Sequence, residues 1–186
     1  MDAPQGVWRR VLSEVASNQA SLNLAQLDTW PVWNSSAQRV LSESKGQLTI
    51  GQRFDLHRIE RKRLIEEMWH VSDLRTGSDP KFTEIEFEWL GQQRERKPVG
   101  TALKSLRLTV TVLCEADGGI EIAAWWRISK WSRFFKSRVD AQARAFALQW
   151  LEDLSGPGTL PIEELRPITF VDSESEDSKT VGTEAE

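Results

Sequence analysis

The sequence predicts an α+β fold in which a curved antiparallel sheet of six to seven strands holds one long C-terminal helix, with two short helices after the first strand. Two observations predict this. Apolar and polar residues alternate with a period of two from about residue 38 to residue 130, which is typical of antiparallel strands. Residues 132–154 then contain no proline or glycine and repeat apolar side chains at helical spacing. That spacing indicates an amphipathic helix of about six turns, whose apolar stripe needs a concave partner.

The elements before the clearest strands are predicted less sharply. A strand is expected over residues 7–16, although Trp8, Leu12 and Val15 also suit one face of a helix. Further strands are expected over residues 37–44, 48–59 and 61–74. In the last of these strands, two alternatives stay open. In one, Leu64, Met68 and His70 face the inside of the fold. In the other, Ile65, Trp69 and Val71 do. A bulge near Glu66 and Glu67 would reconcile them.

Three later strands alternate cleanly, over residues 82–90, 106–114 and 119–129. In the first of them one face carries Ile85, Phe87 and Trp89, and the other carries Glu84, Glu86 and Glu88. Three carboxylates in a row could suggest a metal site, but a metal ion needs ligands that converge on one point. These diverge along a sheet face, so we interpret them as a solvated outer surface.

Composition limits the function classes. The chain has 186 residues with a formal net charge of −4, which suits one domain. Without its acidic C-terminal stretch the chain is nearly neutral, so we expect no nucleic-acid partner. It has no long apolar run, so we expect no integral membrane segment. The single cysteine excludes an internal disulfide, and the N-terminus has no signal-peptide pattern, so a cytoplasmic location is expected.

The composition also changes along the chain. Residues 1–155 are expected to form the folded domain. Residues 156–186 are expected to form an extension, because glycines and prolines follow Leu154 and mark a helix end. From about residue 172 the extension is acidic and almost without apolar side chains, so disorder is expected there.

Four segments in order resemble one known superfamily. They are residues 13–34 with the run Trp30-Pro31-Val32-Trp33-Asn34, residues 48–54 with a glycine before a phenylalanine, the pair Gly100-Thr101, and residues 148–154. Together they are similar to the START-like, or helix-grip, superfamily, which includes the major birch-pollen allergen, polyketide cyclases and lipid-transfer domains. The resemblance spans about residues 7–155. It implies that the run beginning at Trp30 forms a turn between two short helices, and that an apolar small molecule or lipid is the ligand.

A sheet curved around one helix encloses more volume than aliphatic side chains easily fill, so a cavity is expected between them. Its lining is predicted to consist of Trp33, Phe54, Ile85, Phe87, Trp89, Leu108, Val110, Val112, Trp126, Val139 and Phe146. Either these bulky side chains fill the space, or they line a pocket. The pocket is favoured because a buried indole N–H needs an acceptor, which a ligand or a water would supply.

Two alternative functions stay open. The resemblance to polyketide cyclases implies an enzyme that would use Arg53, Glu67 and His70 in the cavity. Two histidines and one cysteine are too few for a zinc site, and we expect neither a metal nor another cofactor. The second alternative is a protein-interaction module of the co-chaperone type. Its candidate surface consists of basic residues at 58–63 and 94–97, with Trp125 and Trp131.

Overall fold

The computed structural model describes residues 3–60, 62–99, 102–156 and 161–165 of the chain. The strands in these ranges are β1 (Gly6–Val11), β2 (Arg39–Ser42), β3 (Arg53–Glu60), β4 (Arg63–Ser78), β5 (Lys81–Arg94), β6 (Lys97–Pro98), β7 (Leu103–Leu113), β8 (Gly119–Ile128) and β9 (Glu163–Leu165). The helices are α1 (Glu14–Ala25), η1 (Leu27–Thr29), α2 (Trp30–Trp33), η2 (Lys130–Phe135) and α3 (Lys136–Ser155), where η marks a 3₁₀ helix.

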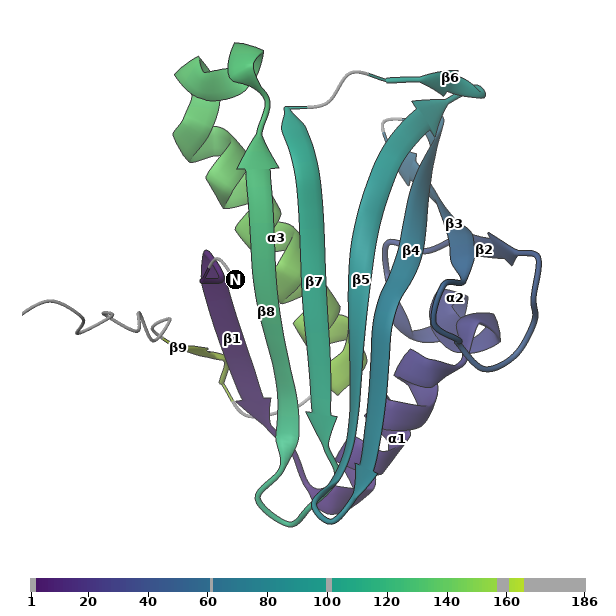
Figure 1. The fold of residues 1–186 in the computed structure, drawn as a ribbon, viewed down its shortest axis with the longest axis vertical. Coiled ribbons are helices and arrows are strands. Elements are labelled where there is room, and N and C mark those ends of the chain that lie inside the picture. The colour runs from purple at the N-terminus through teal and green to yellow at the C-terminus, as the bar shows by residue number, and fades with distance from the viewer. Residues whose placement is uncertain (1–2, 61, 100–101, 157–160, 166–186) are drawn as a thin grey trace, which may run out of the picture.

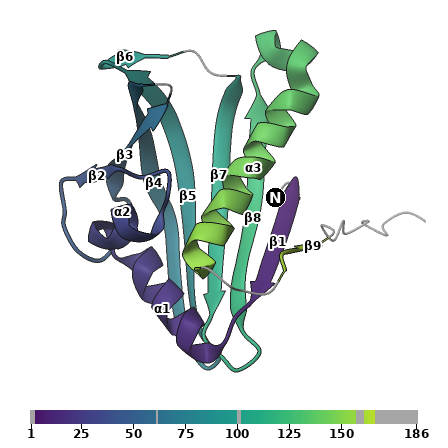
Figure 2. The same ribbon diagram turned by 180° about the vertical axis from the view of Figure 1, so that it is seen from behind.

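The described strands form one antiparallel sheet, and the helices cover one face of it. Its strand order is β2-β3-β4-β5-β7-β8-β1-β9, and β6 pairs with β5. Figures 1 and 2 show α3 crossing the sheet on the same side as α1 and α2. The predicted fold class is therefore confirmed. The two strands beyond the predicted number, β6 and β9, are short.

The first strand is shorter than predicted because a helix begins soon after it. The strand ends at Val11, and the Ser13 hydroxyl accepts a hydrogen bond from the Ala16 amide, which caps α1. A capped helix start of this kind is favourable because it satisfies an amide that has no partner within the helix. The run Trp30–Trp33 forms the short helix α2 itself and not the turn between two helices that the resemblance implied.

On strand β4 the residues of the second predicted alternative face the core. Ile65, Trp69 and Val71 are buried, whereas 40% of Leu64 is exposed. The register shifts between Met68 and Trp69 and again between Val71 and Asp73, so the irregularities lie beyond the position predicted for the bulge. The first shift leaves an extra residue on β5, at Leu90, beside Gly91 with its positive φ of 143°.

Helix α3 also begins later than predicted. Residues 130–135 form η2, and α3 begins at Lys136. Phe135, which has the spacing of the buried stripe, is 63% exposed because it precedes the part of the helix that packs on the sheet. Val139, Ala143, Trp150 and Leu154, which repeat at the helical spacing that predicted this helix, are buried.

The extension after α3 returns to the sheet. Strand β9 pairs with β1, so that Trp8 lies opposite Glu164. The Arg144 side chain of α3 also donates to the Glu164 carboxylate over 2.6 Å. Figure 1 shows β9 at the outer side of β1. The acidic stretch from residue 172, predicted to be disordered, lies outside the described residues.

Candidate functional site

Aromatic side chains fill part of the space between the sheet and the helices. Trp30 of α2 lies edge-on to its neighbours, with ring centroids 5.1 Å from Phe54, 5.6 Å from Phe87 and 5.2 Å from Trp150. This is the favourable geometry for aromatic pairs. The Trp30 indole N–H donates to the Leu24 carbonyl over 3.2 Å. In this region the bulky side chains pack on one another as a core.

Most of the predicted lining residues belong to that core. The members with at most 2% exposure are Phe54, Ile85, Phe87, Leu108, Val110 and Val112. Val139 of α3 is also buried. Trp33 packs against the edge of the core, and its indole N–H donates to the Asn23 carbonyl over 3.2 Å.

A pocket opens beyond the aromatic core, where β5 ends and β7 begins. Its volume is about 420 Å³, within the usual range of ligand pockets. The lining comes from β3, β4, β5, the start of β7 and the first half of α3. The lining residues are Arg58, Glu60, Glu67, Trp69, Trp89, Gln92, Ala102, Leu103, Leu106, Gln142, Ala143 and Phe146. Trp89, Phe146 and Glu67 are thus the sequence-predicted residues that the structure brings together here.

Trp69 connects the pocket to the aromatic core. Its ring stacks on Phe146 with centroids 5.8 Å apart and planes 6° from parallel, and it lies 5.6 Å from Trp150. The side chain is fully buried, yet its indole N–H has no hydrogen-bond partner among the described residues. Burial of a donor without an acceptor is costly, so this atom favours a polar group in the pocket.

Glu67 supplies the second unpaired atom on the same strand face. The residue is only 5% exposed, and its Oε1 accepts a hydrogen bond from Arg58 Nε over 2.9 Å. Its Oε2 is buried and has no partner among the described residues. The Glu67 and Trp69 side chains point to one face because they are two residues apart on β4. A buried acceptor and a buried donor therefore adjoin the same pocket.

Arg58 holds the carboxylate in place. On the inner sheet face it is the diagonal neighbour of Glu67, since Arg58 pairs with Ile65 and Glu67 pairs with Leu56. Arg58 also contacts Glu60 over 3.0 Å. Burial lowers the pKa of Arg58. The nearby carboxylates of Glu67 and Glu60 together raise this pKa by more than burial lowers it, so the net shift is upward. Arg58 therefore stays charged and compensates one oxygen of Glu67.

The β5 bulge sets the opposite wall of the pocket. Trp69 pairs with Trp89, whereas Met68 pairs with Gly91, so Leu90 is the extra residue. Regular alternation would send Trp89 and Gln92 to opposite faces. The bulge returns Gln92 to the inner face, and both residues line the pocket.

Arg53 and His70 lie on the other face of the sheet. They are paired across β3 and β4, while their neighbours Phe54 and Trp69 point inward. His70 Nδ1 is 3.8 Å from the Glu88 carboxylate, and Arg53 is exposed. Of the three residues predicted to act in a cyclase-like enzyme, Glu67 lines the pocket. Arg53 and His70 do not, because strand alternation places their side chains on the outer face of the sheet.

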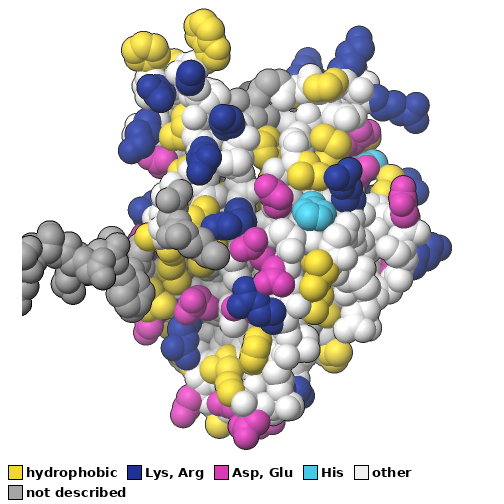
Figure 3. Space-filling view, in the orientation of Figure 1, with side chains coloured by type: hydrophobic (Ala, Val, Ile, Leu, Met, Phe, Trp, Pro, Cys, Tyr) yellow, Lys and Arg dark blue, Asp and Glu magenta, His cyan; other side chains and the backbone are white. Residues whose placement is uncertain are grey.

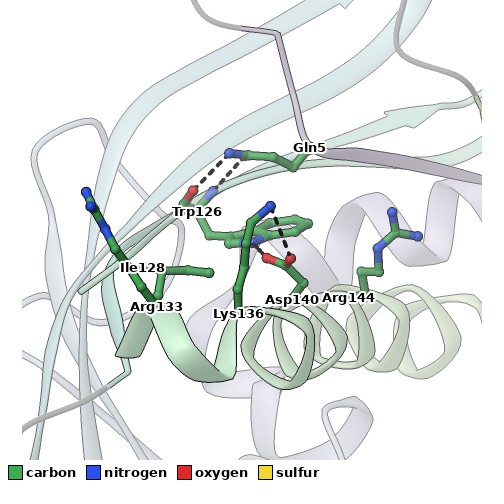
Figure 4. A pocket seen from close by; sticks show the side chains of 7 residues that line it. All are labelled: Gln5, Trp126, Ile128, Arg133, Lys136, Asp140 and Arg144. Atoms are coloured by element: carbon green, nitrogen blue, oxygen red, sulfur yellow. Dashed lines mark hydrogen bonds and ion pairs between the residues drawn. The ribbon is translucent and has the colours of Figure 1, made fainter. Parts of the chain in front are cut away.

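Trp126 lines a second hollow, of about 520 Å³, between β8 and the start of α3 (Figure 4). Its indole N–H donates to Asp140 Oδ1 over 2.8 Å. The Gln5 side chain also bonds both the amide and the carbonyl of Trp126. Because these polar groups are paired within the protein, this hollow gives no comparable reason to hold a ligand.

Several pocket residues were missed by the sequence reasoning. Trp69 and Arg58 were not in the predicted lining, and neither were Gln92, Leu103 and Gln142. The second alternative for β4 contained the signal for Trp69, because Ile65, Glu67, Trp69 and Val71 share one parity. Arg58 was assigned to a basic surface, since nothing in its local sequence shows that it faces a buried carboxylate.

The outer face of the sheet carries paired charges. Arg75 lies 3.3 Å from Glu84, and Arg107 lies 3.7 Å from Glu86 and 4.4 Å from the Trp125 ring centroid. Within the described ranges, no group of three His, Cys, Asp or Glu residues could hold a metal ion. No helix in the described part of the chain is long and apolar enough to cross a membrane.

Comparisons with known proteins identify similar solved structures. No family model matches the sequence. No curated protein matches it either. A hypothetical protein from Helicobacter pylori is 13% identical, with a TM-score of 0.57 over 80% of this chain and 84% of that chain. The protein Ara h 8.0201 is 6% identical, with a TM-score of 0.54 over 81% of this chain and 93% of that chain.

Major latex-like protein 151 from Panax ginseng is 11% identical, with a TM-score of 0.53 over 86% of this chain and 100% of that chain. Identities this low carry information on the fold. The open antiparallel sheet, the short helices after β1 and the long C-terminal helix agree with these neighbours. The chain therefore has the helix-grip fold, an antiparallel sheet packed around one long C-terminal helix, that these solved structures share.

Proposed function

We propose that the protein binds a small apolar molecule that carries a hydroxyl group, in the pocket between the sheet and the first half of α3. Of the seven buried side-chain atoms without a partner in the described residues, Glu67 Oε2 and Trp69 Nε1 belong to residues that line this pocket, and that coincidence carries the proposal. A native fold keeps such atoms unpaired only rarely, because each costs about 1–3 kcal/mol. A ligand that satisfies both would recover much of that cost.

The chemistry of the two atoms selects the polar group of the ligand. A carboxylate oxygen accepts a hydrogen bond, and an indole N–H donates one. A hydroxyl both donates and accepts, so it can serve both atoms. A ligand carboxylate can only accept and would be repelled by Glu67, whereas an ammonium can only donate and would leave Trp69 unsatisfied. The pocket therefore favours an alcohol over an acid or an amine of equal length.

The remaining walls suit an apolar body. Trp89, Phe146 and Leu106 present flat and aliphatic surfaces, and Ala143 leaves space where a larger side chain would close the pocket. Burial of apolar surface contributes roughly 25 cal/mol per Å². The aromatic core beyond Trp69 limits how deep the ligand reaches. Exposed Gln142 lies at the opening.

Calorimetric titration with decanol, decanoate and decylamine tests the proposal. The wild-type protein is expected to bind decanol most tightly. Glu67→Gln and Trp69→Phe each remove one polar partner and keep much of the side-chain shape. Each is expected to weaken decanol binding by roughly tenfold, because one hydrogen bond to a buried group is lost. Glu67→Gln should also weaken the discrimination against decanoate.

The matched control is Glu88→Gln, which removes a carboxylate from the outer face of the same sheet. It should leave all three affinities unchanged. Equal affinities of the wild-type protein for the three probes, or binding unaffected by both pocket variants, would contradict the proposal.

A cyclase-like enzyme in the same cavity is the second candidate, and Glu67 is the observation that favours it. A buried carboxylate with one free oxygen is a suitable general base when a substrate proton lies within reach. The substrate class would be a polyketide-like molecule with an acidic C–H next to a carbonyl. Turnover of such a substrate that is lost in Glu67→Gln and retained in Glu88→Gln would support this function, and absence of turnover in the wild-type protein would exclude it.

A further inference from the structure

The segment between β8 and α3 exposes an unusual group of aromatic side chains. In η2, Trp131 is 91% exposed, Phe134 is 94% exposed and Phe135 is 63% exposed. Aromatic side chains this exposed contribute little buried surface to the fold, and a concentration of them marks an interaction site. Figure 3 shows hydrophobic side chains projecting at the end of the molecule where η2 lies.

The geometry of a 3₁₀ helix arranges these residues in rows. With three residues per turn, side chains three apart lie above one another. Trp131 and Phe134 therefore form one row, and Lys130 and Arg133 form the next. Lys136 and Arg138 continue the positive charge at the start of α3, and all four basic residues are exposed. From residue 130 to residue 139 the sequence contains no acidic residue. We call these seven residues, Lys130, Trp131, Arg133, Phe134, Phe135, Lys136 and Arg138, the η2 surface.

We infer that the η2 surface docks onto the surface of an anionic lipid bilayer. Indole and phenyl rings partition into the boundary between lipid headgroups and acyl chains, where an apolar ring is buried and its polar edge stays hydrated. Lysine and arginine beside them are attracted to the negative surface potential of anionic lipids. The combination supplies the two signals that stable reversible anchoring requires.

The η2 surface combines two features that an anionic bilayer attracts. Without the acidic stretch after residue 171 the chain is nearly neutral, and other exposed basic residues lie at 62–63 and 96–97. Among the described residues, however, the exposed large aromatic side chains all lie in η2. Charge complementarity together with these rings therefore selects the η2 surface as the contact. Lys136 is partly compensated, since its Nζ lies 3.9 Å from Asp140 Oδ2. The other three basic residues of the surface carry the attraction.

Docking would also turn the ligand pocket toward the lipid. The Ser129 amide, next to η2, donates to the carbonyl of the pocket residue Ala102 over 2.9 Å. The pocket and the η2 surface thus lie at the same end of the sheet. Uptake of a ligand from the bilayer rests on the proposed function, whereas docking itself does not.

Vesicle flotation of the full chain without added ligand tests the docking. The protein is expected to float with vesicles of phosphatidylcholine and phosphatidylglycerol, and not with phosphatidylcholine alone. The binding at about 0.1 M salt should fall strongly at about 1 M salt, because exposed charges are then screened. The double variant Trp131→Ser, Phe134→Ser should bind at least roughly tenfold more weakly. Lys130→Gln with Arg133→Gln should also bind more weakly and should reduce the salt dependence.

Two control variants match these changes elsewhere on the surface. Val15→Ser with Val32→Ser removes side chains that are 80% and 89% exposed on α1 and α2. Arg39→Gln with Lys45→Gln removes two exposed charges at and after β2. Both should bind vesicles like the wild-type protein.

Three results would overturn the inference. They are failure of the wild-type protein to float, equal flotation with both vesicle types, and flotation unchanged in the Trp131→Ser, Phe134→Ser variant. Sedimentation velocity without lipid addresses a different occupant. A dimer that the same double variant dissociates would assign the η2 surface to a second copy of the chain and would also overturn the inference. None of these results depends on decanol binding, so docking and ligand binding can fail separately.

Discussion

At the scale of single residues, phenylalanine has two roles in this chain, in the core and on an exposed surface. Phe87 is fully buried, and its ring centroid lies 5.6 Å from that of Trp30 and 5.5 Å from that of Trp150. Phe134, by contrast, is 94% exposed. The same residue type thus contributes to the core at one position and to an interaction surface at the other. Hydrophobicity alone does not distinguish the two, but the period-two pattern around Phe87 does.

Replacement of these two residues should have opposite consequences. Phe87→Ala is expected to lower the free energy of unfolding by about 3–5 kcal/mol, because it leaves a cavity among packed rings. Phe134→Ala should change it by less than about 0.5 kcal/mol, since no packed neighbour is lost. Urea denaturation followed by circular dichroism measures both values. A small effect at Phe87 would show that the aromatic core is not packed as described.

Glu121 makes stability depend on pH. Burial raises its pKa, Arg9 partly offsets this, and the nearby Glu84 raises it further. The folded state therefore binds this proton more readily than the unfolded state does. The ionised carboxylate costs stability above the folded pKa, and the cost is relieved as pH falls through the folded pKa toward the unfolded value.

Glu121→Gln is consequently expected to raise Tm near neutral pH. The gain should shrink as pH approaches about 4, where the unfolded glutamate itself becomes protonated. Glu152→Gln, at an exposed position on α3, provides the matched control and should show no such trend. Scanning calorimetry across this range checks the prediction, and a gain that grows toward low pH would reverse the assigned sign.

At the scale of elements, the sequence predicted the strands with clean alternation well. Residues 82–90, 106–114 and 119–129 all lie largely within observed strands, with Ile85, Leu108 and Ile122 buried as their parity requires. Alternation was sufficient here because one face is covered by helices and the other is solvated. Strand β4 was ambiguous because both of its parities carry apolar side chains.

The pocket was predicted only in part, for the same physical reasons. Glu67, Trp89 and Phe146 were identified, and the general position between the sheet and the C-terminal helix was expected. Gln92 depends on a bulge, which changes which side chains face inward without a strong local signal. Arg58 depends on a contact across two strands. The late start of α3 was hidden because Phe135 continues the apolar spacing of the helix.

The start of α1 offers a test of element boundaries. Ser13→Ala removes the hydroxyl that accepts from the Ala16 amide, so the first turn loses its cap. We expect the free energy of unfolding to fall by about 1 kcal/mol. Ser137→Ala, at an exposed position in α3, is the control. Equal stability of the two variants in urea denaturation would show that Ser13 does not act as the cap.

At the scale of the whole molecule, the helix-grip fold divides its concave face into two regions. Trp30, Phe87 and Trp150 fill one region, and the pocket beside Glu67 and Trp69 occupies the other. The two alternatives left open by the sequence, a filled core and a lined pocket, therefore describe different parts of one face. The η2 surface lies at the pocket end, which brings the proposed ligand site and the proposed docking surface together.

The central claim is that Trp69 N–H and Glu67 meet the polar group of a ligand in the pocket. Nitrogen-edited NMR tests it directly, because the nine tryptophans give separate indole N–H signals and Trp69→Phe identifies one of them. During titration with decanol we predict a saturable shift of the Trp69 signal, with the Trp131 signal unmoved. A Trp69 signal that stays in place while decanol binds, or that moves equally in Glu67→Gln, would contradict the account.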